Sequence, residues 1–532
     1  MLPRESSTRQ TILLAGGLVL LVLALRMPLL DIPFERDEGE YAYIGWRLQH
    51  NELPYRDWFD QKPPGIFWVY RLALSLPLEP VRAVHFVGLV FAAAASCALF
   101  FIGLRFMSRF WAWIAAALFA VLAADPLIQG QAANTELFML LPLILSQVAM
   151  LRAASNSKRA VLFMILAGAL TAVAITFKQV AAVNWFFLVG LYPVLVTGKE
   201  RWRSALAFVI WSAVGVIAVL GFVALYFWLR HGLQDLIYNV FTHNLEYISA
   251  VKASVRFRLC QNTLALLGRT QMIVWVAAAA GLASLLITKR PKWCLFLAGW
   301  IVTSMIGVSA SGYFFPHYFQ QLLPPLALAA AAGAEGLDGI QLWRKLPWWS
   351  RRVALGSILV LLPAMVSYPF LFTYTPAEAM RKIYPREFFA EMPELGRRIA
   401  SVTPPEARVF VFGAEPELLF YARRTSATRY IFLFPLYGPY RNALEKQKAV
   451  ADEILQAQPG AAVYLPNNLF FAAGSEQYFT RWSLSYLRND FSTDTLLTKD
   501  ASGTAHIVSA PSPPPDQRVL GAMLVRKPGN SH

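Results

Sequence analysis

The fold is decided by Thr11-Ile-Leu-Leu-Ala-Gly-Gly-Leu-Val-Leu-Leu-Val-Leu-Ala-Leu-Arg-Met-Pro-Leu-Leu30 and by the segment that follows, Asp31-Ile-Pro-Phe-Glu-Arg-Asp-Glu-Gly-Glu-Tyr41. The first segment is long enough to cross the hydrocarbon core of a bilayer as a helix. Arg4 and Arg9 precede it as in a signal peptide, but no A-x-A cleavage site follows, so we expect an uncleaved first helix. The second segment places a dense run of charges directly beyond that helix, where charged side chains are costly and mark functional sites.

The composition of the whole chain agrees with a membrane protein. Of 532 residues, 57% are apolar or aromatic and only 15% are charged, whereas soluble domains carry about 25% charged residues. The net charge of +16 comes mainly from short basic clusters between apolar runs, a pattern of membrane orientation and not of nucleic-acid binding. The three cysteines form no CxxC pair, so neither a zinc site nor a disulfide framework is expected.

Apolar runs of spanning length recur to about residue 373, and a backbone in lipid must satisfy its own hydrogen bonds, so each run predicts a helix. We predict about eleven transmembrane helices, at 11–30, 83–104, 111–128, 134–151, 160–177, 180–198, 204–229, 271–288, 293–310, 317–336 and 353–373.

The basic clusters predict the orientation, because loops rich in Lys and Arg stay in the cytoplasm. With a cytoplasmic N-terminus, eleven spans put the C-terminus outside, at the outer face of the inner membrane. The short loops 129–133 and 311–316 then lie outside and hold no Lys or Arg. The predicted cytoplasmic loops hold Arg105 and Arg109; Arg152, Lys158 and Arg159; Lys199, Arg201 and Arg203; Lys289, Arg290 and Lys292; and Arg344, Lys345, Arg351 and Arg352.

Beyond residue 375 prolines and charges become more frequent. We therefore divide the chain into a membrane domain, 1–375, and a small extracytoplasmic α/β domain, 376–532. The prolines at 511–515 predict a loop before a short tail, and no internal repeat is visible. Alternation and apolar runs predict strands at 408–413, 429–434 and 461–465 and helices at 415–421 and 441–456.

The first outer loop contains an amphipathic helix. Tyr41, Ile44, Gly45 and Leu48 share one face, as in a helix that lies along the membrane surface. Extended back one turn, this face includes Asp37, with Glu38 at its edge, so a carboxylate is expected to face a membrane-side cavity. An alternative is that Asp37-x-x-Glu40 is only a variant helix-capping box.

Basic residues in the same region are candidates to bind phosphate. Lys62 precedes two prolines, which stiffen the chain, and a fixed ammonium at the interface suits a phosphate oxygen. Arg82, at the mouth of the second span, has the same interpretation. The alternative for both is a side chain that extends from a helix end toward water.

A second charged pair is predicted on the same side of the membrane. Glu136 opens the fourth span and Lys178 lies between spans five and six. An acid so close to hydrocarbon is unusual, although an acid at a helix N-terminus is also favourable in itself. His243 lies in the long loop after span seven, and His317 and Tyr318 open span ten. A lone histidine is more often structural than functional, and no HExxH spacing supports a zinc site.

Taken together, these residues resemble a known family. Asp37-Glu38 with Tyr41, Pro54-Tyr55, Lys62-Pro63-Pro64, Arg82, Glu136, Lys178 and Pro316-His317-Tyr318 are similar to motifs in bacterial relatives of the dolichyl-phosphate-mannose protein mannosyltransferases. These relatives include the aminoarabinose transferases that modify lipid A. The resemblance covers roughly residues 10–375 and is distributed over many short motifs.

The resemblance implies a GT-C fold and an inverting glycosyltransferase that moves a sugar from a polyprenyl-phosphate carrier to a hydroxyl of a lipid, glycan or protein. It implies catalytic roles for Asp37, Glu38 and Glu136, phosphate binding by Lys62, Arg82 and Lys178, and a cavity lined by Tyr41, Tyr55, His243, His317 and Tyr318. The chemistry needs a base for the acceptor hydroxyl and positive charge for the departing phosphate. A divalent cation held by Asp37 or Glu136 is optional.

One departure concerns the residue before the family's lysine, which is glutamate in the aminoarabinose transferases and Gln61 here. Their metal ligands and their sugar therefore do not carry over. The rival class is a transporter or flippase for lipid-linked sugars. Transporters place polar sites in broken helices at mid-membrane and often show two related halves, whereas this sequence concentrates charge at one interface.

Overall fold

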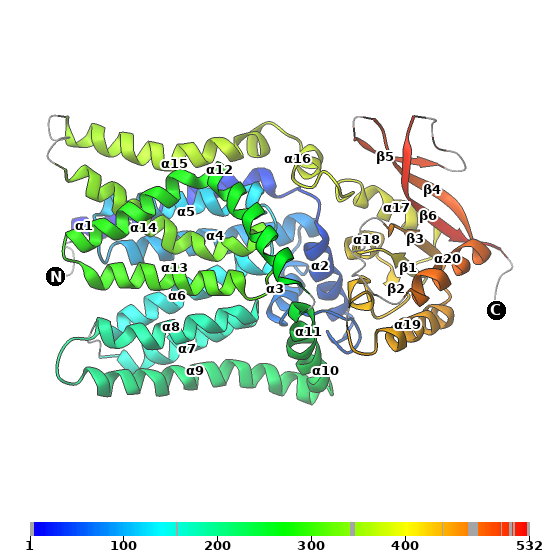
Figure 1. Ribbon diagram of the computed structural model, residues 1–532, viewed down its shortest axis with the longest axis horizontal. Helices are drawn as coiled ribbons and strands as arrows, with labels where there is room; N and C mark the ends of the chain where they lie inside the picture. The colour runs from blue at the N-terminus through cyan, green and yellow to red at the C-terminus, as the bar shows by residue number, and fades with distance from the viewer. Residues whose placement is uncertain are drawn as a thin grey trace.

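A computed structural model describes residues 5–528 except 156–157, 250, 341–345, 439, 467–476, 502, 510–512 and 514–515. Long helices pack side by side along the longest axis of the molecule, as Figure 1 shows. The N-terminus lies at one end of this bundle, and an α/β domain built from the C-terminal residues lies at the other end.

All eleven predicted spans are helical, which confirms a polytopic helical membrane protein. Seven of these helices are long and apolar enough to cross a membrane by length and composition. The helices are α1 (Glu5–Arg26), α4 (Pro80–Gly103), α5 (Arg109–Ala123), α6 (Thr135–Ala154), α7 (Ala160–Ile175), α8 (Ala182–Leu195), α9 (Arg201–Leu229), α12 (Ala253–Ile287), α13 (Pro291–Ser309), α14 (Leu323–Asp338), which the 3₁₀ turn η5 (Pro316–Leu322) precedes, and α15 (Trp348–Phe372). The prediction for the eighth span was too short, because α12 begins at Ala253 and not at residue 271.

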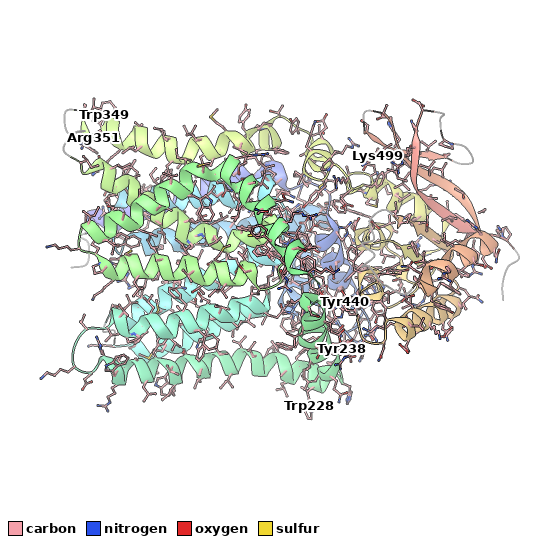
Figure 2. All side chains as sticks on the ribbon, viewed as in Figure 1. Trp228, Tyr238, Trp349, Arg351, Tyr440 and Lys499 are labelled. Carbon is pink, nitrogen blue, oxygen red and sulfur yellow. The ribbon has the colours of Figure 1, made fainter. Side chains whose placement is uncertain are left out.

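The two ends of the bundle differ in charge. The turns between α4 and α5, α6 and α7, α8 and α9, and α12 and α13 lie at the end that carries the N-terminus, and these turns hold the basic clusters. Trp349 and Arg351 lie at this same end in Figure 2, where a tryptophan beside arginines suits the headgroup level of a bilayer. The segregation of basic loops is therefore as predicted, whereas the side of the membrane that they face stays a prediction.

The opposite end of the bundle carries short helices. They are α2 (Arg36–Leu48), α3 (Gly65–Ala73), α10 (Leu233–Ile237), the π-helical turn η4 (Tyr238–Thr242), α11 (His243–Ser249) and α16 (Pro376–Ile383). In Figure 2, Tyr238 and Tyr440 lie at the seam between this end and the C-terminal domain. The Nζ atom of Lys446 joins the two parts there, because it donates to the Tyr238 hydroxyl at 3.0 Å.

The C-terminal domain is a six-stranded mixed sheet with helices packed on it. The strand order is β2-β1-β3-β6-β4-β5, with β1 parallel to β2 and β3, and the remaining neighbours antiparallel. In the register of the parallel pair β1 and β3, Val409 lies beside Ala461. The elements are α17 (Met392–Val402), β1 (Arg408–Phe412), α18 (Pro416–Ala422), β2 (Thr425–Ser426), η7 (Phe434–Leu436), α19 (Ala443–Ala457), β3 (Ala461–Tyr464), α20 (Tyr478–Asp490), β4 (Phe491–Lys499), β5 (Ala505–Ser509) and β6 (Arg518–Arg526).

Four of the five elements predicted in this domain are confirmed, namely β1, α18, α19 and β3. The strand predicted at 429–434 is wrong. The segment contacts the first loop instead. Phe59 donates its backbone N–H to the Arg429 carbonyl at 2.9 Å, and the Arg429 guanidinium donates to the Tyr55 carbonyl at 2.6 Å. The predicted loop at 511–515 lies, apart from Pro513, outside the described residues.

One hydrophobic core joins the first loop to the C-terminal domain. It contains Tyr41 and Ile44 of α2 together with Leu418 of α18 and Phe410 of β1. The helix predicted in the first loop is α2, and its residues 38–45 are buried by the surrounding protein; that it lies along the membrane surface stays a prediction. At Gly39 the backbone of α18 comes so close that an added Cβ would lie 2.6 Å from the backbone nitrogen of Glu417.

Candidate active site

The start of α2 presents Asp37 to the site. Glu35 is the N-cap: its carboxylate accepts the backbone N–H of Glu38 at 3.2 Å, and Glu38 accepts that of Glu35 at 3.3 Å. The predicted capping box of Asp37 and Glu40 is therefore wrong, since the helix begins one residue before Asp37. This leaves the Asp37 carboxylate free of the helix backbone.

The segment that carries Lys62 is held from several sides. The Tyr55 hydroxyl donates to the Lys62 carbonyl at 2.6 Å, and the Asn244 and Gln179 amides donate to the Gln61 carbonyl at 2.7 and 3.1 Å. Tyr55 itself has φ of 71°, a left-handed conformation that side chains other than glycine rarely adopt. Such strain persists only where surrounding contacts enforce it, and it is concentrated at functional sites.

Lys62 joins two carboxylates of α2. Its Nζ atom lies 3.3 Å from Asp37 Oδ1, 3.0 Å from Glu40 Oε2 and 5.1 Å from the centre of the Tyr41 ring. Burial alone would raise the pKa of Asp37, but Lys62 outweighs it, with a smaller effect from His317, and lowers this pKa to about 2. Burial would also lower the pKa of Lys62, yet Asp37 and Glu40 raise it well above its ordinary value. Both groups are therefore charged at neutral pH.

Glu136 and Lys178 form the second pair, as the sequence predicts. Lys178 Nζ donates to Glu136 Oε1 and lies 3.5 Å from the centre of the Tyr318 ring, a cation–π contact. The other oxygen of Glu136 accepts from the Thr135 hydroxyl at 2.8 Å. Glu136 is fully buried, whereas the Asp37 side chain is 27% exposed, so only Asp37 of these two acids is within reach of a substrate.

Asn134 and Gly65 connect the two pairs. The Asn134 side chain accepts from the Tyr41 hydroxyl at 3.1 Å and donates to Asp37 Oδ2 at 3.5 Å, and Asn134 also begins α6, which carries Glu136. Gly65, three residues after Lys62, donates its N–H to the Thr176 carbonyl at 2.8 Å, two residues before Lys178. A Cβ at Gly65 would lie 2.7 Å from that oxygen, so only glycine allows these segments to meet.

The two predicted histidines lie in different places. His317 borders both ion pairs and contacts the side chain of Gln129. His243 is buried between the rings of Phe59 and Tyr440, with centroids 5.0 and 4.9 Å away. Burial, with a smaller contribution from Lys446, lowers the pKa of His243 to about 3, so this ring is neutral. Its position supports packing of the loop against the C-terminal domain.

Two other predicted residues are engaged elsewhere. Arg82 pairs with Asp31 at 2.7 Å, and its side chain is half exposed. Glu38 is buried and accepts from the backbone N–H of Ala133 at 2.7 Å and contacts His85 Nε2 at 2.9 Å. Glu38 therefore fastens α2 to α4 and to the turn before α6. The structure brings neither residue into contact with Lys62 or Lys178.

Sequence reasoning missed Glu40 and Asp60 as members of the site. Glu40 lies one helical turn after Asp37, and Asp60 lies two residues before Lys62. Their nearness in sequence to these two residues was the only hint that they belong to the site. The described residues contain no group of three or more His, Cys, Asp or Glu side chains arranged to hold a metal. Asp37 and Glu136 do not fit a cation as they stand, since a lysine ammonium already contacts each of them.

The arrangement suits transfer of a group that leaves as an anion. An ionised, accessible carboxylate can accept a proton from a hydroxyl, and two ammonium groups a short distance away can stabilise negative charge on a departing oxyanion.

Solved structures with the same fold are membrane glycosyltransferases. ArnT from Cupriavidus metallidurans, bound to undecaprenyl phosphate, superposes with a TM-score of 0.58 at 14% identity over 99% of each chain. The archaeal oligosaccharyltransferase AglB from Archaeoglobus fulgidus, in complex with an inhibitory peptide and a dolichol-phosphate, gives 0.53 at 12% identity over 97% of this chain and 76% of AglB. Arabinofuranosyltransferase AftD from Mycobacteria gives 0.54 at 13% identity over 97% of this chain and 41% of AftD.

Neither a family model nor a curated protein matches the sequence, and at these identities the likeness is one of fold. The chain therefore has the GT-C fold of polytopic membrane glycosyltransferases, as the resemblance of its motifs implied.

Proposed function

We propose that this protein is a glycosyltransferase that moves a sugar from a polyprenyl-phosphate carrier to an acceptor hydroxyl at the outer face of the inner membrane. The observation that carries the proposal is the contact of a partly exposed carboxylate, Asp37, with a partly exposed ammonium, Lys62, 3.3 Å away. The fold supports it, because ArnT, which shares that fold, has been solved with undecaprenyl phosphate bound.

In the proposed reaction the acceptor oxygen attacks the anomeric carbon as the bond from that carbon to the phosphate oxygen breaks. Attack opposite the leaving group inverts the configuration. Asp37 takes the hydroxyl proton, and polyprenyl phosphate leaves with its charge stabilised by Lys62 and Lys178. The sugar passes through a state of oxocarbenium character, as in other glycosyl transfers.

Because Asp37 pairs with Lys62, we expect the donor to bind before Asp37 can accept a proton. A carboxylate with a pKa of about 2 is a poor base. A donor phosphate that contacts Lys62 draws the ammonium away from Asp37, and loss of this partner raises the basicity of the carboxylate. Asp37 therefore becomes an effective base only when the donor is bound.

Transfer by the purified protein in bilayers tests the proposal. Supplied with the polyprenyl-phosphate sugars of its own host, the protein should release polyprenyl phosphate and form a glycosylated acceptor, both detected by mass spectrometry. Binding of the donor without release would mean a binding protein, and donor movement between leaflets without release would mean a flippase. In cells that lack the protein, the lipid-linked sugar that accumulates identifies the donor.

A further inference from the structure

Two carboxyl groups flank Lys62 and contact it through different atoms. Glu40 Oε2 accepts from Lys62 Nζ at 3.0 Å, and Asp60 Oδ1 accepts from the backbone N–H of Lys62 at 2.7 Å. Glu40 is 2% exposed and Asp60 is fully buried. The second oxygens, Glu40 Oε1 and Asp60 Oδ2, are also buried, and the described part of the chain offers neither of them a hydrogen-bond donor.

Both carboxyl groups contact Lys62, and Asp60 lies close enough to Glu40 to raise its pKa. An ionised carboxylate can only accept, so a proton on one partner is needed for the two groups to share a hydrogen bond. Two buried, ionised carboxylates in contact would repel strongly, and each free oxygen would also remain unsatisfied. Burial first, and then Asp60, raise the pKa of Glu40 well above its ordinary range.

We propose that Glu40 and Asp60 share one proton and thereby position Lys62 and set the charge around it, so that its ammonium stays available to an anionic phosphate. With the shared proton, the pair contributes one negative charge beside Lys62; without it, the pair contributes two. The inference deepens the proposed function and rests on it in one respect, that Lys62 contacts the phosphate of the carrier lipid.

Other titratable groups surround the pair and enter any pH dependence. They come from α2, the Lys62 segment, α11, the start of α6, the turn between α7 and α8, and η5, and they are Asp37, Tyr41, Tyr55, Lys62, Tyr247, Glu136, Lys178, His317 and Tyr318. Asp37 is already ionised at neutral pH, and the pKa of Lys62 and that of Tyr41 are raised well above their ordinary values. When hydroxide removes the shared proton, the new negative charge therefore falls next to the phosphate site.

Isosteric variants separate this proposal from a structural role. Glu40→Gln keeps an oxygen for Lys62 and gives Asp60 an amide donor, so the hydrogen bonds survive without a titratable proton. Asp60→Asn does the same from the other side. Both fix the charge of the pair at minus one. Glu52→Gln is the matched control, because Glu52 lies in the same loop but pairs with Arg47.

Infrared spectroscopy tests the shared proton without any substrate. We expect the wild-type protein at pH 7 to show the C=O stretch of a buried protonated carboxyl that disappears at alkaline pH. This alkaline loss should be smaller by the signal of one carboxyl group in Glu40→Gln and in Asp60→Asn and unchanged in Glu52→Gln, and the part that remains comes from other buried acids such as Glu417 and Glu35. If no variant at the pair alters the protonated-carboxyl signal, the shared proton is disproved, whatever the protein's activity.

Binding of undecaprenyl phosphate as a function of pH tests the charge-setting role. Above pH 7 the phosphate monoester has largely lost its second proton, since that pKa is about 6, so the ligand's charge is nearly constant. We expect the affinity of the wild-type protein for undecaprenyl phosphate to fall about tenfold or more as the shared proton is lost. One negative charge added a few ångströms from the phosphate weakens binding by this order. Affinity in Glu40→Gln and Asp60→Asn should not fall.

The outcomes of the two measurements are distinguishable. An equal alkaline decline in wild type and in both variants would overturn the role of the pair. Higher affinity in both variants than in the wild type already at pH 7, with unchanged thermal unfolding, would also overturn it, since it would mean that both carboxylates of the wild type are ionised at that pH. Failure of the wild-type protein to bind undecaprenyl phosphate at any pH would instead overturn the proposed function, while the infrared result still decides the shared proton.

Discussion

Asp37 differs from the other carboxylates at the site because it is both ionised and accessible. Glu38 and Glu136 are buried and fully engaged with His85 and Lys178, and Glu40 contacts Asp60. Because Glu35 caps α2, replacing Asp37 removes no cap. Its charge and its contacts with Lys62 and Asn134 are therefore the only things that a substitution to asparagine changes.

We expect Asp37→Asn to lower transfer by about 10²–10⁴-fold, the range for loss of a general base. The thermal unfolding midpoint should stay near that of the wild type. Transfer rate and unfolding are measured on the same detergent-solubilised sample, with Asp31→Asn as a matched control, because Asp31 is an exposed acid paired with Arg82. Wild-type turnover in Asp37→Asn would exclude Asp37 as the base.

Lys62→Met is expected to weaken use of the donor more than it disturbs folding. Loss of a hydrogen bond to a charged group costs about 1.5–3 kcal/mol, which corresponds to an increase of about 10- to 150-fold in the KM for the donor. Initial rates at varied donor concentration measure this, with Lys499→Met as the control, because Lys499 lies in the C-terminal domain (Figure 2). An unchanged KM would mean that Lys62 only extends toward water.

Most of the acidic and basic residues of the site were predictable from sequence. Asp37, Lys62, Glu136 and Lys178 are charges placed where charge is costly, and the family resemblance pointed to the same positions. Glu40 and Asp60 were not predicted because their contact crosses from a helix to a loop, and spacing along the chain does not encode it. Arg82 matches the family motif by its position in the sequence, but its guanidinium forms an ion pair with Asp31 and not with a group of the site.

At the scale of elements, the contact between α2 and α18 connects the site to the C-terminal domain. Gly39→Ala should destabilise the protein, because the added methyl group would collide with the backbone of Glu417. Overpacking typically costs about 1–3 kcal/mol, more than the roughly 0.5–1 kcal/mol that alanine gains over glycine within a helix. We expect a lower unfolding midpoint and faster proteolysis of the C-terminal domain.

Gly221→Ala in α9 is the control for Gly39→Ala. An added Cβ there meets nothing within 4 Å, so only the helical preference for alanine should act, and the unfolding midpoint should stay equal or rise. Equal midpoints for the two variants would contradict tight packing of α18 on α2.

The same interface predicts a pH dependence of stability. Glu417 is fully buried, and neither of its carboxyl oxygens has a hydrogen-bond partner among the described residues. Burial, then Glu415, raise the pKa of Glu417 well above its ordinary value. The protonated form is therefore favoured in the fold, and its contribution to stability is fully present below about pH 4.3, the usual glutamate pKa, and is lost as the pH rises through the raised value.

Glu417→Gln should remove part of that loss, because glutamine is neutral throughout. The contribution amounts to about 1.4 kcal/mol for each unit by which the pKa rises. Unfolding midpoints measured from pH 4 to 9 should decline less in the variant than in the wild type, with the remaining slope due to groups such as Glu35, whose pKa burial also raises. Parallel curves for the two proteins would mean that Glu417 titrates normally.

The elements of the C-terminal domain were only partly predictable. Its buried strands β1 and β3 are short apolar runs, and these the sequence pattern indicates. The segment 429–434 has the composition of a strand, yet tertiary contacts with the first loop decide its conformation. Strand β4 was not predicted, since it carries polar residues around register shifts at Thr493–Thr495 and Leu497–Thr498, which disturb the alternation of apolar and polar residues.

At the scale of the whole molecule, the two ends of the bundle differ in charge and in chemistry. The basic turns lie at the end that carries the N-terminus, and α2, whose Asp37 pairs with Lys62, and the C-terminal domain lie at the other end. The positive-inside rule predicts that the basic end faces the cytoplasm. A polyprenyl-phosphate sugar would be used on the opposite side of the membrane.

Paired reporter fusions test this placement. We expect a phosphatase that is active only outside the cytoplasm to be active when fused after residue 375, beyond α15, and inactive when fused after residue 290, in the turn between α12 and α13. That turn holds Lys289 and Arg290 and, just beyond the fusion point, Lys292, and short loops with such residues are retained in the cytoplasm. A cytoplasmic reporter should give the reverse result at both points. Activity of the phosphatase after residue 290 alone would put Asp37 and Lys62 in the cytoplasm, where a carrier that presents its sugar outside could not reach them.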